Sequence, residues 1–232
     1  MAQTLQPVGS GYVGEVGSVD QRNRVLRNTY WLLALSMLPT VLGACIGVQT
    51  GVFAHLGLGA SLLVFFGGAF GLMFAVSHFK NSSAGVFFLL GFTFFMGLML
   101  SNLLGYALGF RNGSSLIMTA FGGTAGVFFG MATLATVVKR DLSGLARFLT
   151  IGVWIAIVAS VIAMFTHSSA AMLAISAAMM VVFSLLIMID VKRVLDGGET
   201  NYVMATLAIY LDLYNVFQNM LLLLTSLSGD RD

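Results

Sequence analysis

The sequence predicts an all-α membrane protein, a bundle of seven transmembrane helices. Hydrophobic residues make up 58% of the 232 residues and charged residues only 9%, whereas soluble domains carry roughly 25% charged residues. A transmembrane helix needs about 20 apolar residues, so the chain has room for about seven spans with short connections. The 27 glycines suit helices that pack through small residues, and the alternating pattern of a membrane β-barrel is missing from the sequence.

Seven apolar segments follow a polar start, and each is long enough to cross a bilayer. They cover residues 29–49, 56–78, 84–109, 114–138, 146–166, 169–194 and 202–227. The connections are short, so neighbouring helices are expected to pack antiparallel. We therefore divide the chain into a flexible cytoplasmic N-terminal tail (residues 1–27), a seven-helix transmembrane domain (residues 28–228) and a short periplasmic C-terminus (residues 229–232).

The basic residues predict which side of the membrane each connection occupies. If the chain starts inside, the two outer basic residues are Arg111 and Arg231. The inner ones are Arg22, Arg24, Arg27, Lys80, Lys139, Arg140, Arg147, Lys192 and Arg193. Inner connections of membrane proteins carry an excess of Lys and Arg. This distribution predicts a cytoplasmic N-terminus and a C-terminus on the other side.

Glycines recur at four-residue spacing and predict close packing between helices. They are Gly43 with Gly47, Gly67 with Gly71, Gly105 with Gly109, and the row Gly122, Gly126 and Gly130. This spacing places the glycines on one helix face, where a neighbouring backbone can approach closely. We expect these faces to pack inside one bundle rather than to form a dimer. Pro39 is expected to kink the first span.

Two acidic residues, Asp190 and Asp212, fall inside the last two apolar segments and are the strongest candidates for a functional site. An Asp near the bilayer centre costs about 2.5 to 3.5 kcal/mol on insertion scales, so it needs a partner or water. The Asp196-Gly197-Gly198 turn joins two antiparallel helices, which allows the two aspartates to face each other. Their offsets from the turn are uneven, about six against sixteen residues, so the spacing alone leaves contact open.

If the two carboxyl groups meet, repulsion and burial disfavour full ionisation, and we expect the pair to share a proton and sense pH. Full deprotonation would open the cytoplasmic side and offer oxygen ligands to a hard cation such as calcium. Asn215 and Asn219 extend a polar stripe from Asp212 along the last helix. A purely structural alternative stays open, in which Asp190 pairs with Arg193 and Asp212 bonds a buried amide.

Other classes of site find little support in the sequence. Cys45 is the single cysteine and the three histidines are scattered, so convergent metal ligands are not expected. A membrane aspartyl protease would need a Gly-x-Gly-Asp motif, whereas Tyr210-Leu211-Asp212 stands here, and no Gly-x-Ser-x-Gly elbow occurs. We expect no catalytic residues, no cofactor and no enzymatic activity.

Short motifs in several segments resemble the Bax inhibitor-1 family. They are Arg27-Asn28-Thr29-Tyr30, Gly122-Gly123-Thr124-Ala125, Leu173-Ala174-Ile175-Ser176-Ala177, Leu213-Tyr214-Asn215 and, most specific, Gly197-Gly198-Glu199-Thr200-Asn201-Tyr202. The likeness covers nearly the whole chain after the tail and is greatest to the bacterial YccA-like branch. It implies six helices around a central seventh, in the inner membrane of a Gram-negative bacterium.

The resemblance implies two activities that differ in kind. The YccA-like branch is similar to a modulator of FtsH, a membrane-bound ATP-dependent protease that grips a cytoplasmic N-terminal tail, which residues 1–27 would supply. In other members, an aspartate pair on the last two helices is associated with a pH-sensitive calcium leak, and Asp190 and Asp212 match those positions. The arginine that pairs with the aspartates in those members has no counterpart, since residues 56–78 contain neither Arg nor Lys.

We therefore expect an inner-membrane protein that binds and modulates the FtsH protease. The alternative is a pH-sensitive calcium or cation leak through Asp190 and Asp212. Removing the tail tests the first function, and neutralising the carboxyl groups tests the second. The lipid bilayer is the expected surrounding, and no nucleic-acid partner is expected.

Overall fold

The computed structural model describes residues 13–51, 57–166 and 168–229 of the chain. Within these ranges the chain forms seven α-helices. They are α1 (Val13–Thr50), α2 (Leu58–Phe79), α3 (Ser83–Leu108), α4 (Gly113–Val137), α5 (Ser143–Phe165), α6 (Ser169–Leu195) and α7 (Tyr202–Leu227). Each is long and apolar enough to cross a membrane, which confirms the predicted fold class.

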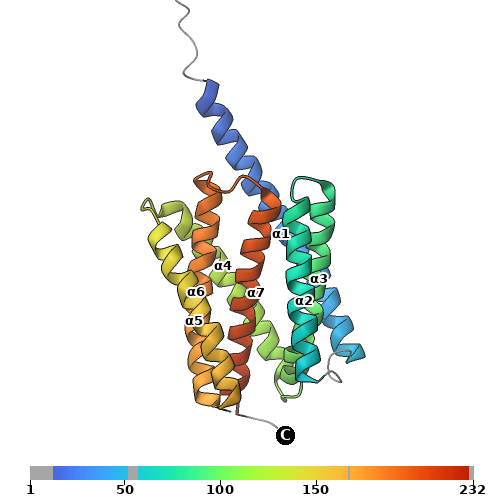
Figure 1. Cartoon of the computed structure of the whole chain (residues 1–232). Helices are drawn as coiled ribbons and strands as arrows, with labels where there is room; N and C mark the ends of the chain where they lie inside the picture. Colours follow the sequence, from blue (N-terminus) through green and yellow to red (C-terminus); the bar gives the residue numbers. More distant parts are fainter. Residues whose placement is uncertain (1–12, 52–56, 167, 230–232) are drawn as a thin grey trace, which may run out of the picture.

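The start of α1 differs most from the sequence prediction. The helix begins at Val13, so residues 13–27, assigned to a flexible tail, are helical, while residues 1–12 lie outside the described residues. Adding a turn to a helix that already exists costs little, because nucleation is the expensive step. The polar turns of α1 therefore continue beyond the bundle as a helical arm (Figure 1). We call residues 13–24 the arm.

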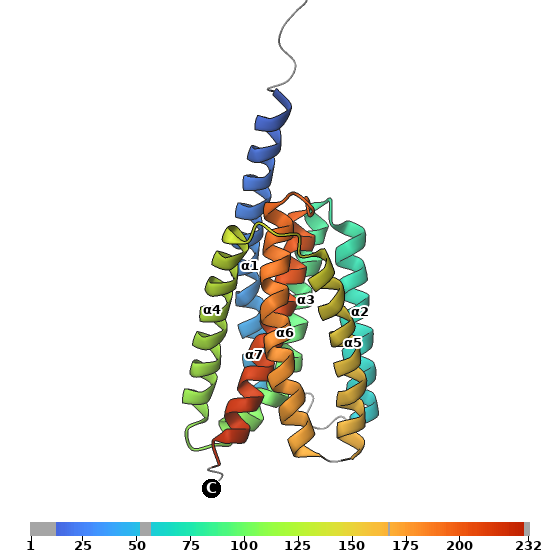
Figure 2. The same ribbon diagram turned by 90° about the vertical axis from the view of Figure 1, so that its left-hand side faces the viewer.

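Helix α7 lies in the middle of the bundle. It packs against α1, α2, α3, α4 and α6, whereas α5 reaches only α6 among the described helices. Figure 1 shows α7 between α6 on one side and α2 with α3 on the other, and Figure 2 shows α5 beside α6. Five helices, rather than the six implied by the family resemblance, thus contact the central one.

Polar side chains tie α7 to its neighbours inside the apolar core. The Tyr210 hydroxyl lies 2.9 Å from the Thr40 hydroxyl of α1 and 3.4 Å from the carbonyl oxygen of Thr93 in α3. The Thr206 hydroxyl also donates to the carbonyl oxygen of Thr29 in α1, at 3.3 Å. Satisfied polar groups of this kind fix the register of α1 against α7, since leaving them unpaired in the core would be costly.

Helices α1 and α3 approach closely through glycines, as the sequence predicts for one glycine pair. A Cβ atom added to Gly43 would collide with the carbonyl oxygen of Phe94, and one added to Gly47 would lie 2.5 Å from the Cβ of Ser101. Gly97 of α3 completes the contact, because a Cβ there would collide with the carbonyl oxygen of Thr40. The backbones of the two helices therefore meet with no space for a side chain.

The prediction of close packing is wrong for most of the other spaced glycines. Their added Cβ atoms would meet open space within this chain; they are Gly67, Gly71, Gly105, Gly122, Gly126 and Gly130. A Cβ atom added to Gly109 would meet only carbonyl oxygens in the last turn of α3. Four-residue spacing places glycines on one face but does not determine which way that face points, and here the faces point out of the bundle.

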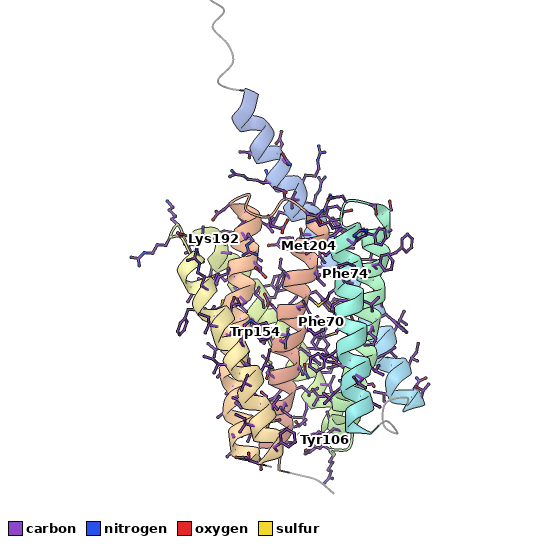
Figure 3. All side chains as sticks on the ribbon, in the orientation of Figure 1. Phe70, Phe74, Tyr106, Trp154, Lys192 and Met204 are labelled. Atoms are coloured by element: carbon purple, nitrogen blue, oxygen red, sulfur yellow. The ribbon has the colours of Figure 1, made fainter. Side chains whose placement is uncertain are left out.

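The outer surface of the bundle carries large apolar side chains. Phe70 and Phe74 of α2 and Trp154 of α5, labelled in Figure 3, are 61%, 73% and 65% exposed. A soluble protein rarely exposes contiguous apolar surface on this scale. The surface is the one that a lipid bilayer covers.

Candidate carboxylate site

The connection between α6 and α7 positions both candidate aspartates. Gly197 has a positive φ of 79°, which favours glycine, and a Cβ there would lie 2.8 Å from Nε of Arg22 in α1. The Asn201 side chain then accepts hydrogen bonds from the backbone N–H groups of Val203 and Met204, at 3.0 and 3.1 Å. Asn201 is therefore the N-cap that starts α7, where the sequence predicts the helix to begin.

Asn201 also anchors this connection to the turn between α2 and α3. Its amide nitrogen donates to the carbonyl oxygen of Lys80 at 3.0 Å and to the side-chain oxygen of Asn81 at 2.9 Å. Together with Arg22 at Gly197, these bonds join three segments that are distant in sequence at one end of the bundle. Sequence analysis missed these contacts, although an Asn before an apolar run is a recognisable capping signal.

The side chains of Asp190 and Asp212 lie close enough to interact with each other. The uneven offset from the turn therefore does not keep them apart. A hydrogen bond between two carboxyl groups requires that one of them carry the proton, because an ionised carboxylate is only an acceptor. The two side chains thus face each other between α6 and the central helix, and a proton shared by them stays a prediction.

The two aspartates have different surroundings. Asp212 is 6% exposed, and its Oδ2 atom has no hydrogen-bond partner among the described residues. The Asp190 side chain is 18% exposed, and its Oδ1 atom lies 3.8 Å from Nη1 of Arg193. Asp190 thus lies near Arg193, its partner in the purely structural alternative, and also near Asp212. A buried carboxyl oxygen without a partner is costly, so Asp212 is the member whose presence packing alone does not explain.

The amides of the predicted polar stripe bond to their own helix. The Asn215 side chain donates to the carbonyl oxygen of Leu211 and the Asn219 side chain donates to the carbonyl oxygen of Asn215, both at 2.8 Å. Within the described residues neither amide donates to Asp212. The role of Asn215 and Asn219 in supporting the aspartates stays a prediction.

Two carboxyl groups alone would not complete the shell of a calcium ion. Calcium takes six to eight oxygen ligands, whereas two carboxyl groups offer about four oxygens. Among the described residues no group of three or more His, Cys, Asp or Glu side chains converges on one point. A calcium ion bound by the aspartates or passing them therefore stays a prediction.

The fold and the site together define a multi-pass α-helical membrane protein with a paired carboxyl site at its central helix. The chain belongs to the family described as "Inhibitor of apoptosis-promoting Bax1", abbreviated Bax1-I, whose family model matches residues 22–229. The match runs from the arm to the end of α7.

Curated relatives match nearly the whole chain. "Modulator of FtsH protease YccA" from Escherichia coli strain K12 is 33% identical over 213 residues, covering 92% of this chain and 94% of the relative. An uncharacterised protein of Neisseria meningitidis serogroup B is 36% identical over 215 residues, covering 90% and 93%. An uncharacterised membrane protein of Vibrio cholerae is 35% identical over 205 residues, covering 88% and 90%. The relatives and the seven apolar helices identify a multi-pass protein of the bacterial inner membrane.

Proposed function

We propose that this protein binds the FtsH protease and modulates its turnover of membrane proteins. The observation that carries the proposal is its similarity, over almost the full length of both chains, to a protein named modulator of FtsH protease. The arm adds a physical basis, because it extends beyond the bundle (Figure 2). The excess of basic residues at the same end favours a cytoplasmic position for the arm.

A protease that binds the arm would pull on α1, a helix that packs tightly in the bundle. Pulling on the arm first loads α1, which packs extensively against α3. That interface is held by glycine contacts between backbones and by the hydrogen bond between Thr40 and Tyr210. A protease engaged on the arm would therefore be slowed before it extracted the bundle, and its capacity for other membrane substrates would fall.

The test is degradation of the purified protein by FtsH in proteoliposomes, with and without residues 2–18. This deletion is preferable to removing residues 1–27, because Val25 packs against Val194 and Ala205 and Arg22 contacts Gly197. We expect the deletion to slow degradation several-fold. Removal of residues 229–232 at the opposite end is the matched control and should leave the rate unchanged. Degradation at the normal rate without residues 2–18 would contradict recognition through the arm.

A pH-sensitive cation leak is the second candidate, because one specific observation favours it. Asp190 and Asp212 interact between α6 and α7, and the buried Oδ2 atom of Asp212 has no hydrogen-bond partner among the described residues. Loss of the shared proton would leave two repelling charges. Repulsion would separate the two helices and admit water and cations.

A further inference from the structure

A groove of about 360 Å³ opens on the outer face of α1. Arg27, Tyr30, Trp31 and Ala34 line it. These positions share one face of the helix, because residues three and four apart are neighbours on a helix surface. The groove takes no part in the carboxylate site or in the arm, and further along the same helix Leu38 is 62% exposed. The groove therefore opens into the lipid-covered surface.

The depth of the groove follows from the contacts that α1 makes with α7. Val25 packs against Val194 and Ala205 near the α6–α7 connection, and the carbonyl oxygen of Thr29 accepts the Thr206 hydroxyl. Arg27 lies between these two contacts, so it is level with the first turn of α7. After Arg27 the rest of α1, residues 28–50, contains no charged residue. Arg27 thus marks the boundary at which lipid headgroups meet the hydrocarbon layer.

The residues of the groove offer the two kinds of contact that a phospholipid makes at this depth. Arg27 is exposed and forms no ion pair with an acidic side chain among the described residues, so its guanidinium is available to a phosphate, which it can hold through two hydrogen bonds. Trp31, one turn further in, is 74% exposed. Exposed Trp and Tyr rings concentrate at the membrane–water interface, where one part of the ring is wet and the other apolar.

Tyr30 gives the groove a fixed side wall. Its ring meets the ring of Phe128 in α4 edge to face, with the centroids 5.9 Å apart. The backbones of α1 and α4 do not contact each other among the described residues, so these two rings bridge the space between the helices. A rigid aromatic wall beside a free guanidinium is a preorganised site, which reduces the entropy lost when a ligand is ordered.

We propose that this groove binds one anionic phospholipid, with its phosphate on Arg27 and the upper part of its acyl chains along Trp31 and Ala34. An anionic headgroup such as phosphatidylglycerol is preferred over a zwitterionic one because it brings no ammonium to oppose Arg27. Arg24, exposed one turn before Arg27, adds a second positive charge near the headgroup. A basic residue at the membrane surface favours anionic lipid by about fivefold.

The two tryptophans of the chain make the site directly measurable. Trp154→Phe leaves Trp31 as the single tryptophan at the groove, and Trp31→Phe leaves Trp154, which is exposed on α5. The purified protein in vesicles is titrated with spin-labelled phosphatidylglycerol or spin-labelled phosphatidylcholine, and the quenching of tryptophan fluorescence is recorded. We expect phosphatidylglycerol to quench Trp31 with about fivefold higher apparent affinity than phosphatidylcholine, and both lipids to quench Trp154 equally.

Arg27→Gln in the Trp154→Phe background should bring the affinity for phosphatidylglycerol down to that for phosphatidylcholine. Arg140→Gln, which removes an exposed charge from the α4–α5 connection at the same end, is the matched control and should keep the preference. Equal quenching of Trp31 by both lipids would overturn the proposal, as would an equal loss of preference in the two variants. If Arg27→Gln fails to fold, the comparison of lipids with Arg27 in place still decides.

Discussion

Asp190 and Asp212 are the two residues on which the proposed cation leak depends. Their spacing in the sequence allowed contact but could not establish it, because the stagger between two helices depends on the connection and on packing. The structure brings the carboxyl groups together, with Asp212 on the central helix in the core. In the proposed leak, a proton shared by the two carboxyl groups is what a change of pH acts on.

Cation flux into liposomes from about pH 6 to about pH 8 tests the role of this pair. If the pair gates a leak, flux rises with pH because deprotonation makes the two carboxylates repel, and Asp190→Asn and Asp212→Asn abolish the pH dependence. Asp196→Asn is the matched control, since Asp196 is 3.0 Å from Lys192 at the end of α6 and outside the pair. A flux equal to that of protein-free liposomes would contradict the leak.

Asp141, in the connection between α4 and α5, is a carboxyl group outside the membrane-spanning helices whose pKa is shifted. Its Oδ1 atom accepts hydrogen bonds from the Ser143 hydroxyl and from the Ser143 backbone N–H, at 2.9 Å for the latter. These bonds favour the ionised form and lower the pKa of Asp141 below its ordinary value. The lowered pKa adds to the free energy of unfolding at pH values above the unfolded-state pKa of about 4. This stabilisation is lost as the pH falls through the lower pKa of the folded state.

Ser143→Ala should raise the pKa of Asp141 toward its ordinary value, because the hydroxyl bond is the largest cause of the shift. The measurement is an NMR titration of the carboxyl carbon in the purified protein. Ser83→Ala, at the start of α3 and away from Asp141, should leave the titration unchanged. An unaltered pKa in Ser143→Ala would show that the hydroxyl does not hold the carboxylate.

At the scale of elements, the sequence predicts where the membrane-spanning helices lie, but it predicts poorly which face of each helix packs inside the bundle. Six of the seven apolar segments agree with the helices within a few residues, because apolar length follows bilayer thickness. The start of α1 was placed too late, since hydropathy marks where the membrane ends and not where the helix ends. Glycine spacing correctly predicted a packed face at Gly43 and Gly47 but not at Gly122, Gly126 and Gly130. Nearly every face of these helices is apolar, so hydropathy does not show which face is buried.

The difference between buried and open glycines can be measured. Gly97→Val should destabilise the bundle by about 1 to 3 kcal/mol or more, because a side chain there would separate α1 from α3. Gly126→Val, a change of the same volume on an open face of α4, should alter stability by no more than about 0.5 kcal/mol. Reversible unfolding in mixed micelles measures both. Equal effects would contradict the assignment of the α1–α3 contact as the tight interface.

At the scale of the whole molecule, the arm, the basic residues and the capped connection of α7 gather at one end of the bundle. The Arg22 side chain of the arm lies beside Gly197, where it fills the space that a Cβ atom would need, and Asn201 donates hydrogen bonds to the α2–α3 turn. The arm is therefore joined to the same connection that sets the depth of Asp212. Membership of the Bax1-I family and a relative named as an FtsH modulator give this end its proposed partner.

The most direct measurement is the rate at which FtsH degrades a second membrane protein in proteoliposomes, with and without this chain at equal molar amount. The account predicts that the full chain slows degradation several-fold and that the chain lacking residues 2–18 does not, because the protease can no longer engage the arm. An unchanged rate in the presence of the full chain would contradict modulation of FtsH. Equal slowing by both forms would contradict the role of the arm.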